Sequence, residues 1–399
     1  MGAIVSVVLA TLLAGLALSR IDMLPVLNRD ALRLSASSRA LTVDPELLPP
    51  SGWSSLRGDQ LTNGEAQQDR LELDRARFRV GAGVYMTSTY DLDLRIPSYS
   101  GNGYVWLRWD DSLQNYLETR NREIGDLFKL VNGLLSDAEP VLRPVAEGPV
   151  LQADGSYYQL FSFVGRFYID KISFRHYPFI NVSLPLVLEV DDEDGEFRYL
   201  SLRLMADTRN SGMGLYAGII GWLNGGWSIA EYRHHYATNF GLGGGEDDYS
   251  QIIYDMSFGT SAWAAFWRLL LPLTVLMTMV LLVFKVRADE QDARASIPVT
   301  VLLTLVFLQQ GYRAELPNLP FLTFLDQVYV IAYVVTLLAF VLVIWIGRRY
   351  ADMEAIEDPL VKGMLQQRLQ RLDDGWPLVV VSLGVVGVTL CWLTLPPGA

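Results

Sequence analysis

Histidine and cysteine are scarce in this 399-residue chain, which has three histidines and one cysteine, Cys391. A single cysteine excludes a disulfide within the chain and a zinc site built from several cysteines. The few histidines argue against a histidine-rich metal site, and we expect neither a metal nor a cofactor. Acidic residues outnumber basic ones, and the formal net charge is -12. Nucleic acid is therefore not an expected partner, because its phosphates would be repelled.

Charge is absent from residues 2–18, which form an apolar run that Arg20 follows. This length is typical of a secretory signal peptide, with small residues near Ala17 and Ser19 as a cleavage point. The basic segment that usually precedes such a core is missing, so an uncleaved N-terminal anchor is the alternative. Either interpretation assigns residues 1–19 to export. Residues 20–77 form an N-terminal extension to which we assign no chemistry.

Residues 78–260 carry the pattern of an all-β domain. Apolar residues recur at every second position from Val80 to Met86, as in a half-buried strand. Turn signals such as Gly101-Asn102-Gly103 and Asp194-Gly195 recur along the segment, and one helical patch is expected at residues 113–135. About ten short strands in this length predict an immunoglobulin-like β-sandwich.

Four long apolar segments follow within residues 261–399. We expect an all-α bundle of transmembrane helices at about 262–285, 293–312, 324–347 and 375–396, because each can cross about 30 Å of hydrocarbon. The connections after the first and third segments carry most of the basic residues: Lys285, Arg287 and Arg294, then Arg348, Arg349, Lys362, Arg368 and Arg371. By the positive-inside rule both connections are cytoplasmic and the β domain lies outside.

The second apolar segment carries a stripe in which polarity is ordered. Its members are spaced 4, 3, 4 and 3 residues apart, which is one face of a helix: Ser296, Thr300, Leu303, Phe307 and Gln310. Hydroxyls occupy the cytoplasmic end, bulky apolar groups the middle and an amide the outer end. A pore-lining helix explains this order, because hydroxyls can solvate an ion and a ring of Leu and Phe can gate by excluding water. One helix cannot enclose water, so we expect several copies around a symmetry axis.

Asp292 stands just before this stripe. A carboxylate repeated in a ring at a pore mouth concentrates cations and repels anions, which predicts permeant cations. The alternative is an ordinary juxtamembrane charge in a cytoplasmic loop. The adjacent stripe favours the ring.

The stretch from Glu315 to Asp326, ELPNLPFLTFLD, resembles the link between the second and third transmembrane helices of pentameric ligand-gated ion channels. The resemblance to this family, the Cys-loop receptor superfamily, is strongest for bacterial members, which carry a Leu-Pro, a second Pro and an aromatic-x-Thr here. The matching positions are Leu316, Pro317 and Pro320. Counting back from Pro317, the resemblance places the family's basic pore residue on Arg294 and its gate leucine on Leu303. It implies a homopentamer around a central pore in a bacterial inner membrane, in contact with lipid, with the N-terminal domain in the periplasm.

The β domain extends the resemblance. Residues 80–109 look like the family's first two strands, and Tyr177-Pro178-Phe179 looks like the start of its Phe-Pro-Phe-Asp loop. Ile180 replaces the acid of that loop, and both of the loop's cysteines are absent. Bacterial members commonly lack the disulfide, whereas the missing acid removes the usual electrostatic contact between this loop and the membrane domain.

In this family agonists bind between neighbouring sandwiches, against aromatic side chains. The resemblance implies these ligand-binding candidates: Tyr236, Phe240 and Tyr249 on one subunit, with Asp207 and Arg209 in the loop before them, and Tyr104 and Trp106 on its neighbour. Aromatic rings suit an amine through cation–π attraction. A proton is the alternative agonist, acting on carboxylates and on His234 or His235, because histidine is the side-chain type that can change charge near neutral pH. Core or subunit packing is the competing explanation for each aromatic residue.

The acidic runs at residues 191–194 and 246–248 offer oxygen ligands for a calcium ion. The alternative is that they are solvent-exposed turns, which requires no bound ion.

Together these features predict a pentameric ligand-gated ion channel subunit that is cation-selective and opened by a small molecule or protons. The gating link is expected to join residues 316–321 to residues 96–103 and 177–181, so that movement of the sandwich tilts the pore helices. A non-conducting, membrane-anchored periplasmic sensor or binding module is the alternative. It explains neither the ordered stripe of the second apolar segment nor the link motif that follows. We do not expect an enzyme, because no compact Ser/His, metal or paired-carboxylate constellation is present.

Overall fold

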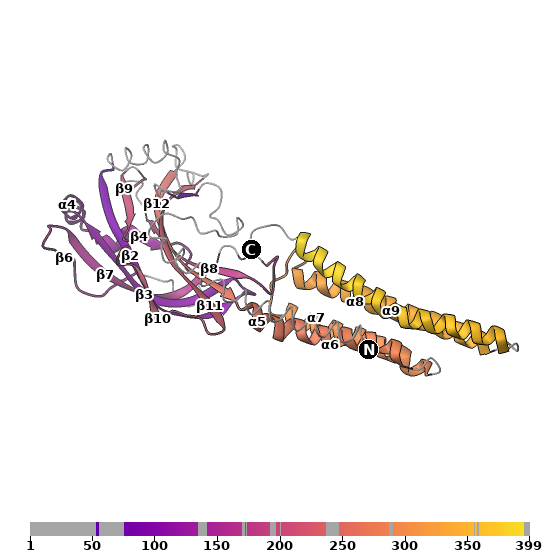
Figure 1. Ribbon diagram of the computed structural model, residues 1–399. Coiled ribbons are helices and arrows are strands. Elements are labelled where there is room, and N and C mark those ends of the chain that lie inside the picture. The colour runs from indigo at the N-terminus through magenta and orange to yellow at the C-terminus, as the bar shows by residue number, and fades with distance from the viewer. Residues whose placement is uncertain are drawn as a thin grey trace. The chain divides into compact units, whose positions relative to one another are not determined.

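The computed structural model describes residues 53–55, 76–134, 142–169, 172, 174–191, 197–199, 201–236, 247–286, 290–354, 356 and 359–394. The predicted signal peptide, nearly all of the N-terminal extension and Phe240 lie outside the described residues. The chain forms two compact units. The first contains the strands, and the second contains residues 174–180 together with the helices that follow residue 260 (Figure 1).

The first unit is a β-sandwich of two sheets. One sheet has five strands in the order β1-β11-β12-β8-β4, with bounds Trp53–Ser55, Trp222–Tyr236, Asp247–Thr260, Asn181–Val190 and Phe128–Leu130. The other has seven strands, with the path β10-β2-β3-β7-β5 and bounds Gly212–Tyr216, Phe78–Asp93, Ser98–Trp109, Tyr157–Tyr168 and Arg143–Pro144. Strand β6 (Val150–Leu151) pairs with β7, and β9 (Leu202–Ala206) pairs with β2.

Alternation of side chains builds the core of this sandwich. Val80, Ala82 and Val84 of β2 are buried, as the period of two predicts, and Leu184 and Leu186 of β8 are buried as well. The expected helical patch is shorter than predicted. Helix α4 (Asp111–Arg120) ends where Asn121 adopts a left-handed conformation, and a short 3-10 helix, η4 (Ile124–Leu127), leads into β4.

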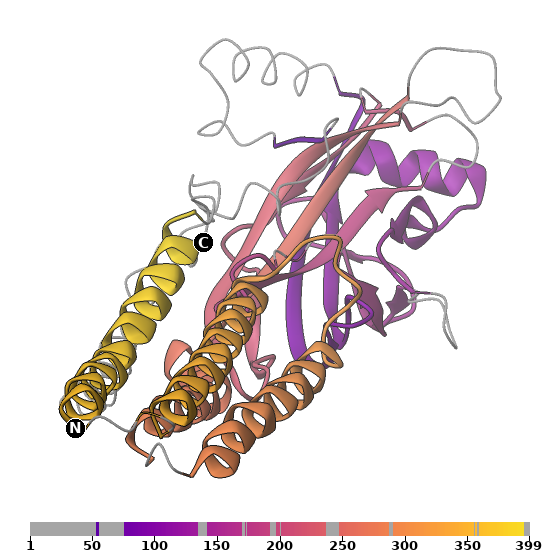
Figure 2. The ribbon, with the colours of Figure 1, turned by 90° about the vertical axis from the view of Figure 1, so that its right-hand side faces the viewer.

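The second unit contains four helices that are long and apolar enough to cross a membrane, which confirms the predicted transmembrane helices. The first runs from Ala262 to Lys285 through α5 (Ala262–Ala265), η5 (Phe266–Leu270), α6 (Leu271–Leu282) and η6 (Val283–Lys285). The others are α7 (Gln291–Arg313), α8 (Phe324–Glu354) and α9 (Pro359–Thr394). Helix α7 packs against α6 and α8, and α8 packs against α9, as Figures 1 and 2 show.

Helices α8 and α9 extend beyond the predicted spans. Helix α8 continues past residue 347 to Glu354, and α9 begins at Pro359 rather than near residue 375. The prediction followed hydropathy alone. Residues 359–375 are not continuously apolar, but they are rich in Leu, Gln and Arg, which favour helix, and Pro359 suits a first helical position.

Candidate functional site

Helix α7 has one buried face and one exposed face within the subunit. Its buried residues are Arg294, Pro298, Val301, Leu305 and Tyr312. All six predicted pore-lining residues lie on the exposed side: Asp292, Ser296, Thr300, Leu303, Phe307 and Gln310. Leu303 is 57% exposed and Phe307 is 62% exposed. This face of α7 is left uncovered by the part of the chain that the structure describes.

The hydroxyl groups on this face are oriented by their own helix. Ser296 Oγ donates to the Ala293 carbonyl at 3.0 Å, and Thr300 Oγ1 donates to the Ser296 carbonyl at 2.9 Å. Because each hydroxyl proton is directed toward the backbone, the oxygen lone pairs remain to accept from, or solvate, a neighbouring group. Such oxygens suit a cation better than an anion.

At the N-terminal end of α7, the basic residue is buried in an ion pair, whereas the acidic residues are exposed. Arg294 is 1% exposed, and its Nη2 lies 2.6 Å from Asp373 Oδ1 on α9. Lys285, at the end of the first membrane helix, pairs with Asp374 at 2.8 Å. Glu290 and Asp292 are exposed, and neither forms an ion pair with a described residue. Sequence reasoning placed Arg294 at the pore helix but did not identify Asp373 as its partner.

At the C-terminal end of α7, Asp326 joins the helix to the start of α8. Its Oδ1 accepts hydrogen bonds from the Tyr312 hydroxyl and from Arg313 Nε at 2.8 Å. Its Oδ2 accepts from the backbone N–H and the hydroxyl of Thr323, and the Asp326 N–H donates back to Thr323 Oγ1 at 3.1 Å. Thr323 and Asp326 thus form a capping box on α8. The threonine and the aspartate of the link motif therefore have a structural role that sequence reasoning did not assign.

Residues 174–180 contact this same region. The Phe324 N–H donates to the Arg175 carbonyl at 2.8 Å, and the Leu325 N–H donates to the Tyr177 carbonyl at 3.1 Å. The ring of Tyr177 stacks on that of Tyr312 with centroids 6.0 Å apart. Burial raises the pKa of Tyr177 above its ordinary value. The predicted loop residues thus contact the C-terminal end of α7 and the start of α8.

Apolar contacts take the place of the missing acid in this loop. Phe179 packs its ring against Phe324, with centroids 6.2 Å apart, and against Trp392 of α9, at 5.9 Å. Ile180 is buried, and its N–H donates to Thr260 Oγ1, which in turn donates to the Pro178 carbonyl at 2.7 Å. In the link itself Leu316 is buried, whereas Pro317 is half-buried and Pro320 is exposed.

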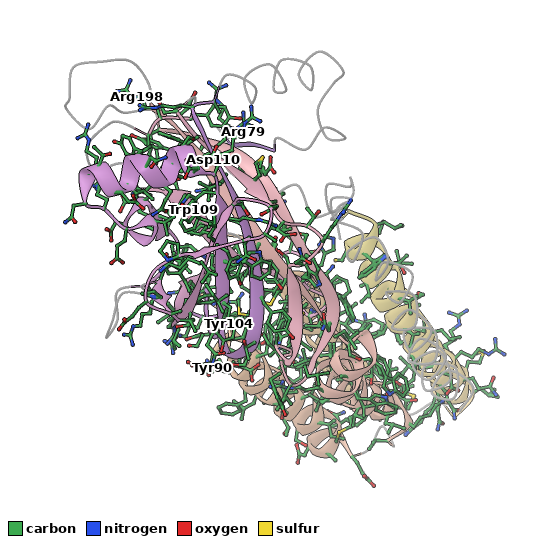
Figure 3. All side chains as sticks on the ribbon, turned by 90° about the vertical axis from the view of Figure 1, so that its left-hand side faces the viewer. Arg79, Tyr90, Tyr104, Trp109, Asp110 and Arg198 are labelled. Atoms are coloured by element: carbon green, nitrogen blue, oxygen red, sulfur yellow. The ribbon has the colours of Figure 1, made fainter. Side chains whose placement is uncertain are left out.

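The ligand-binding candidates form two groups on different sheets of the sandwich. In the seven-stranded sheet, Trp106 Nε1 donates to Asp207 Oδ2 at 3.1 Å, and the Arg209 N–H donates to Asp207 Oδ1. Although burial opposes it, hydrogen bonding from Asn210, Trp106 and Arg209 holds the pKa of Asp207 below its ordinary value. Tyr104 lies on the same strand, β3, and is exposed (Figure 3).

In the five-stranded sheet, Tyr236 packs edge-on against Tyr249 with ring centroids 5.6 Å apart. Its hydroxyl donates to Glu189 Oε1 at 2.8 Å, and Glu189 Oε2 also contacts His234 Nδ1 at 2.5 Å and accepts from Gln251 Nε2 at 2.8 Å. Burial raises the pKa of Tyr236. Sequence reasoning missed Glu189, although a single charged residue in the mostly apolar strand NVSLPLVLEV is the signal that points to it.

No group of three or more potential metal-ligating side chains occurs among the described residues. No protein-family model matches the chain, and no curated protein matches it.

Proposed function

We propose that the chain is a subunit of a pentameric ligand-gated ion channel in a bacterial inner membrane, with its β-sandwich in the periplasm. The observation that carries this proposal is the exposed face of α7, which runs from Asp292 through hydroxyls to Leu303 and Phe307. Five copies of this face around one axis would line a water-filled path with a hydrophobic constriction. The lipid-facing role falls to α9, because only 11% of its most apolar stretch of 18 residues is buried.

Cation selectivity is supported by the charges and dipoles of this face. The Asp292 carboxylate is exposed at the inner end, and the Ser296 and Thr300 oxygens direct their lone pairs away from the helix backbone. A ring of carboxylates followed by hydroxyl oxygens favours potassium or sodium over chloride.

Gating in this proposal starts in the β-sandwich, where a small amine or protons bind. Residues 174–180 connect strands β7 and β8, and they hold the start of α8 through two backbone hydrogen bonds. Tyr312 and Asp326 then connect that point to α7. A ligand that favours one arrangement of these contacts shifts the tilt of α7 and the width of the Leu303 and Phe307 rings.

Reconstitution of the full chain into planar bilayers tests the proposal. Reversal potentials are recorded in asymmetric potassium chloride while pH is stepped and small amines are added. We expect unitary currents that reverse near the potassium potential, and Asp292→Ala should lose that preference because the ring of charge is gone. Asp352→Ala is the matched control, since Asp352 is an exposed acid on α8. Reversal near the chloride potential would contradict cation selectivity.

The non-conducting sensor is the second candidate, and the same experiment separates it. Silence at every pH and with every amine, from protein shown to be folded and pentameric, would favour the sensor. The ordered polarity of α7 argues against it, because a simple anchor gains nothing from exposed hydroxyls and an exposed carboxylate on one face.

A further inference from the structure

Two successive aspartates of α9 neutralise the two basic side chains at the inner ends of the first membrane helix and α7. Asp374 pairs with Lys285, and both side chains are exposed. Asp373 pairs with Arg294, and here the side chains are only 13% and 1% exposed. Arg294 Nε has no hydrogen-bond partner among the described residues, so the contact with Asp373 is its main compensation. A buried guanidinium without a paired carboxylate is costly, and loss of Asp373 would drive Arg294 toward another acid.

The N-cap and the first turn of α7 carry two alternative acids, Glu290 and Asp292. Glu290 precedes Arg294 by four residues, which is the spacing at which Glu and Arg side chains pair along a helix. The backbone already joins these two residues, because the Arg294 N–H donates to the Glu290 carbonyl at 3.0 Å. Asp292 lies between them and is exposed. An arginine released from Asp373 can therefore reach the Glu290 carboxylate, whereas Asp292, two residues away, lies on the opposite side of the helix.

We infer that Asp373 is a specificity-determining residue, although it does not lie on the exposed face of α7. It holds Arg294 on the buried face of α7, and the Glu290 carboxylate beside Asp292 consequently remains uncompensated at the inner mouth. The inference rests on the proposed channel function and adds a selectivity role for α9. In a pentamer the effect is repeated five times around the axis, so a change of one side chain per subunit alters the whole ring.

The neighbouring pair supplies a matched comparison. Lys285 and Asp374 are joined at a similar distance, 2.8 Å, but lie in solvent. Solvent screens such an exposed pair, and Lys285 ends a different helix from the one that carries Glu290 and Asp292. Asp374→Asn therefore removes an equal charge from the next residue of α9 without releasing Arg294.

Reversal potentials of the full chain in planar bilayers test the inference. Each variant is placed in a Leu303→Ala background, because a smaller side chain in the hydrophobic ring lets water and ions pass without an agonist. We expect Asp373→Asn to lower the permeability ratio of potassium over chloride by roughly 16-fold, because one unit charge about 5 Å from an ion in water disfavours potassium about fourfold and favours chloride about fourfold. Asp374→Asn should leave the ratio unchanged, and so should Arg294→Gln/Asp373→Asn, in which both charges are absent.

The outcomes separate this inference from the channel proposal. Conducting Asp373→Asn pentamers with an unchanged ratio would overturn the inference and leave the channel intact. Absence of current in the Leu303→Ala background, from folded pentamers, would overturn both. If Asp373→Asn alone does not assemble, the double variant decides, because removing both members of a buried pair is tolerated far better than removing one. A ratio that rises several-fold in the double variant would show that Arg294 acts on ions even when paired, which contradicts the inference.

Discussion

Asp326 illustrates how a single buried carboxylate fixes the geometry between two helices. It is 4% exposed and accepts hydrogen bonds from Tyr312, Arg313 and Thr323. These donors come from the last turn of α7 and from the residue that caps α8. The carboxylate therefore holds the C-terminal end of α7 in one position relative to α8.

Asp326→Asn should lower the stability of the protein. An amide accepts through one oxygen only and brings a donor toward the Thr323 or Arg313 donors, so at least one charged hydrogen bond is lost. A hydrogen bond to a charged group contributes about 1.5 to 3 kcal/mol. Tryptophan fluorescence during thermal unfolding in detergent measures the change, with the exposed Asp352→Asn as control. Equal melting temperatures for both variants would contradict the role assigned to Asp326.

Asp255 predicts a pH dependence of stability in the β-sandwich. Its Oδ2 accepts from the Ser183 hydroxyl, and its Oδ1 is buried without a hydrogen-bond partner among the described residues. Burial raises the pKa of Asp255 from 3.8 to about 6, against the opposing effect of hydrogen bonds from Ser183 and the Met256 N–H. The folded protein therefore keeps a proton that the unfolded chain releases. The stability from this proton is full below a pH of about 4 and is lost as the pH rises to about 6.

Asp255→Asn keeps a neutral group at this position and should abolish that loss. We expect the variant and the wild type to have the same free energy of unfolding near a pH of about 4. At pH 7 the variant should be more stable by up to about 3 kcal/mol, since each pKa unit corresponds to roughly 1.4 kcal/mol. The measurement is the difference in melting temperature between the two proteins across this pH range. Asp154→Asn is the control, because a hydrogen bond from Arg108 holds the pKa of that exposed carboxyl below its ordinary value. A difference that is constant with pH would refute the prediction for Asp255.

At the scale of elements, Gly347 of α8 and Gly363 of α9 have opposite surroundings. A Cβ at Gly363 of α9 would meet no atom within 4 Å. A Cβ at Gly347 of α8 would lie 2.8 Å from the side chain of Gln291, whose Nε2 donates to the Gly347 carbonyl. One position is open, whereas the other is occupied by a contact that joins α7 to α8.

Alanine at these two glycines should therefore have opposite effects. Gly363→Ala should stabilise the protein by about 1 kcal/mol, the difference in helix propensity between the two residues. Gly347→Ala gains the same propensity but displaces Gln291 and loses its hydrogen bond, so we expect a net loss. Thermal unfolding of both variants in the same detergent measures this. Stabilisation by both would mean that the Gln291 contact contributes nothing.

The same elements show what a sequence can predict. Hydropathy and a period of two or of 3.6 residues are local properties, so the four spans, the alternation in β2 and the stripe on α7 could be predicted. The ends of α8 and α9 could not, because helix continues there through residues that are not continuously apolar. Partners distant in sequence were also missed. Asp373 lies 79 residues from Arg294, and Glu189 lies 45 residues from His234. Only the fold determines which charges meet across such separations.

At the scale of the whole molecule, the exposed face of α7 predicts assembly. A folded monomer would leave the bulky side chains of Leu303 and Phe307 uncovered on the same face as Asp292. Native mass spectrometry of detergent-solubilised protein should give five copies of the 44.7 kDa chain, less any segment removed on export. A stable monomer would contradict both the pentamer and the pore.

The heptapeptide 174–180 belongs to the helical unit, whereas the strands on both sides of it belong to the sandwich. Its aromatic partners, Tyr312, Phe324 and Trp392, all come later in the chain. During synthesis the loop therefore emerges long before the surfaces that cover Tyr177 and Phe179 exist. The sandwich can form early, but the apolar side chains of residues 174–180 remain exposed until the last helix is in place. In a fragment that stops at Gly259 these side chains would stay exposed permanently. The tendency of that fragment to aggregate would measure how much the helices protect the loop.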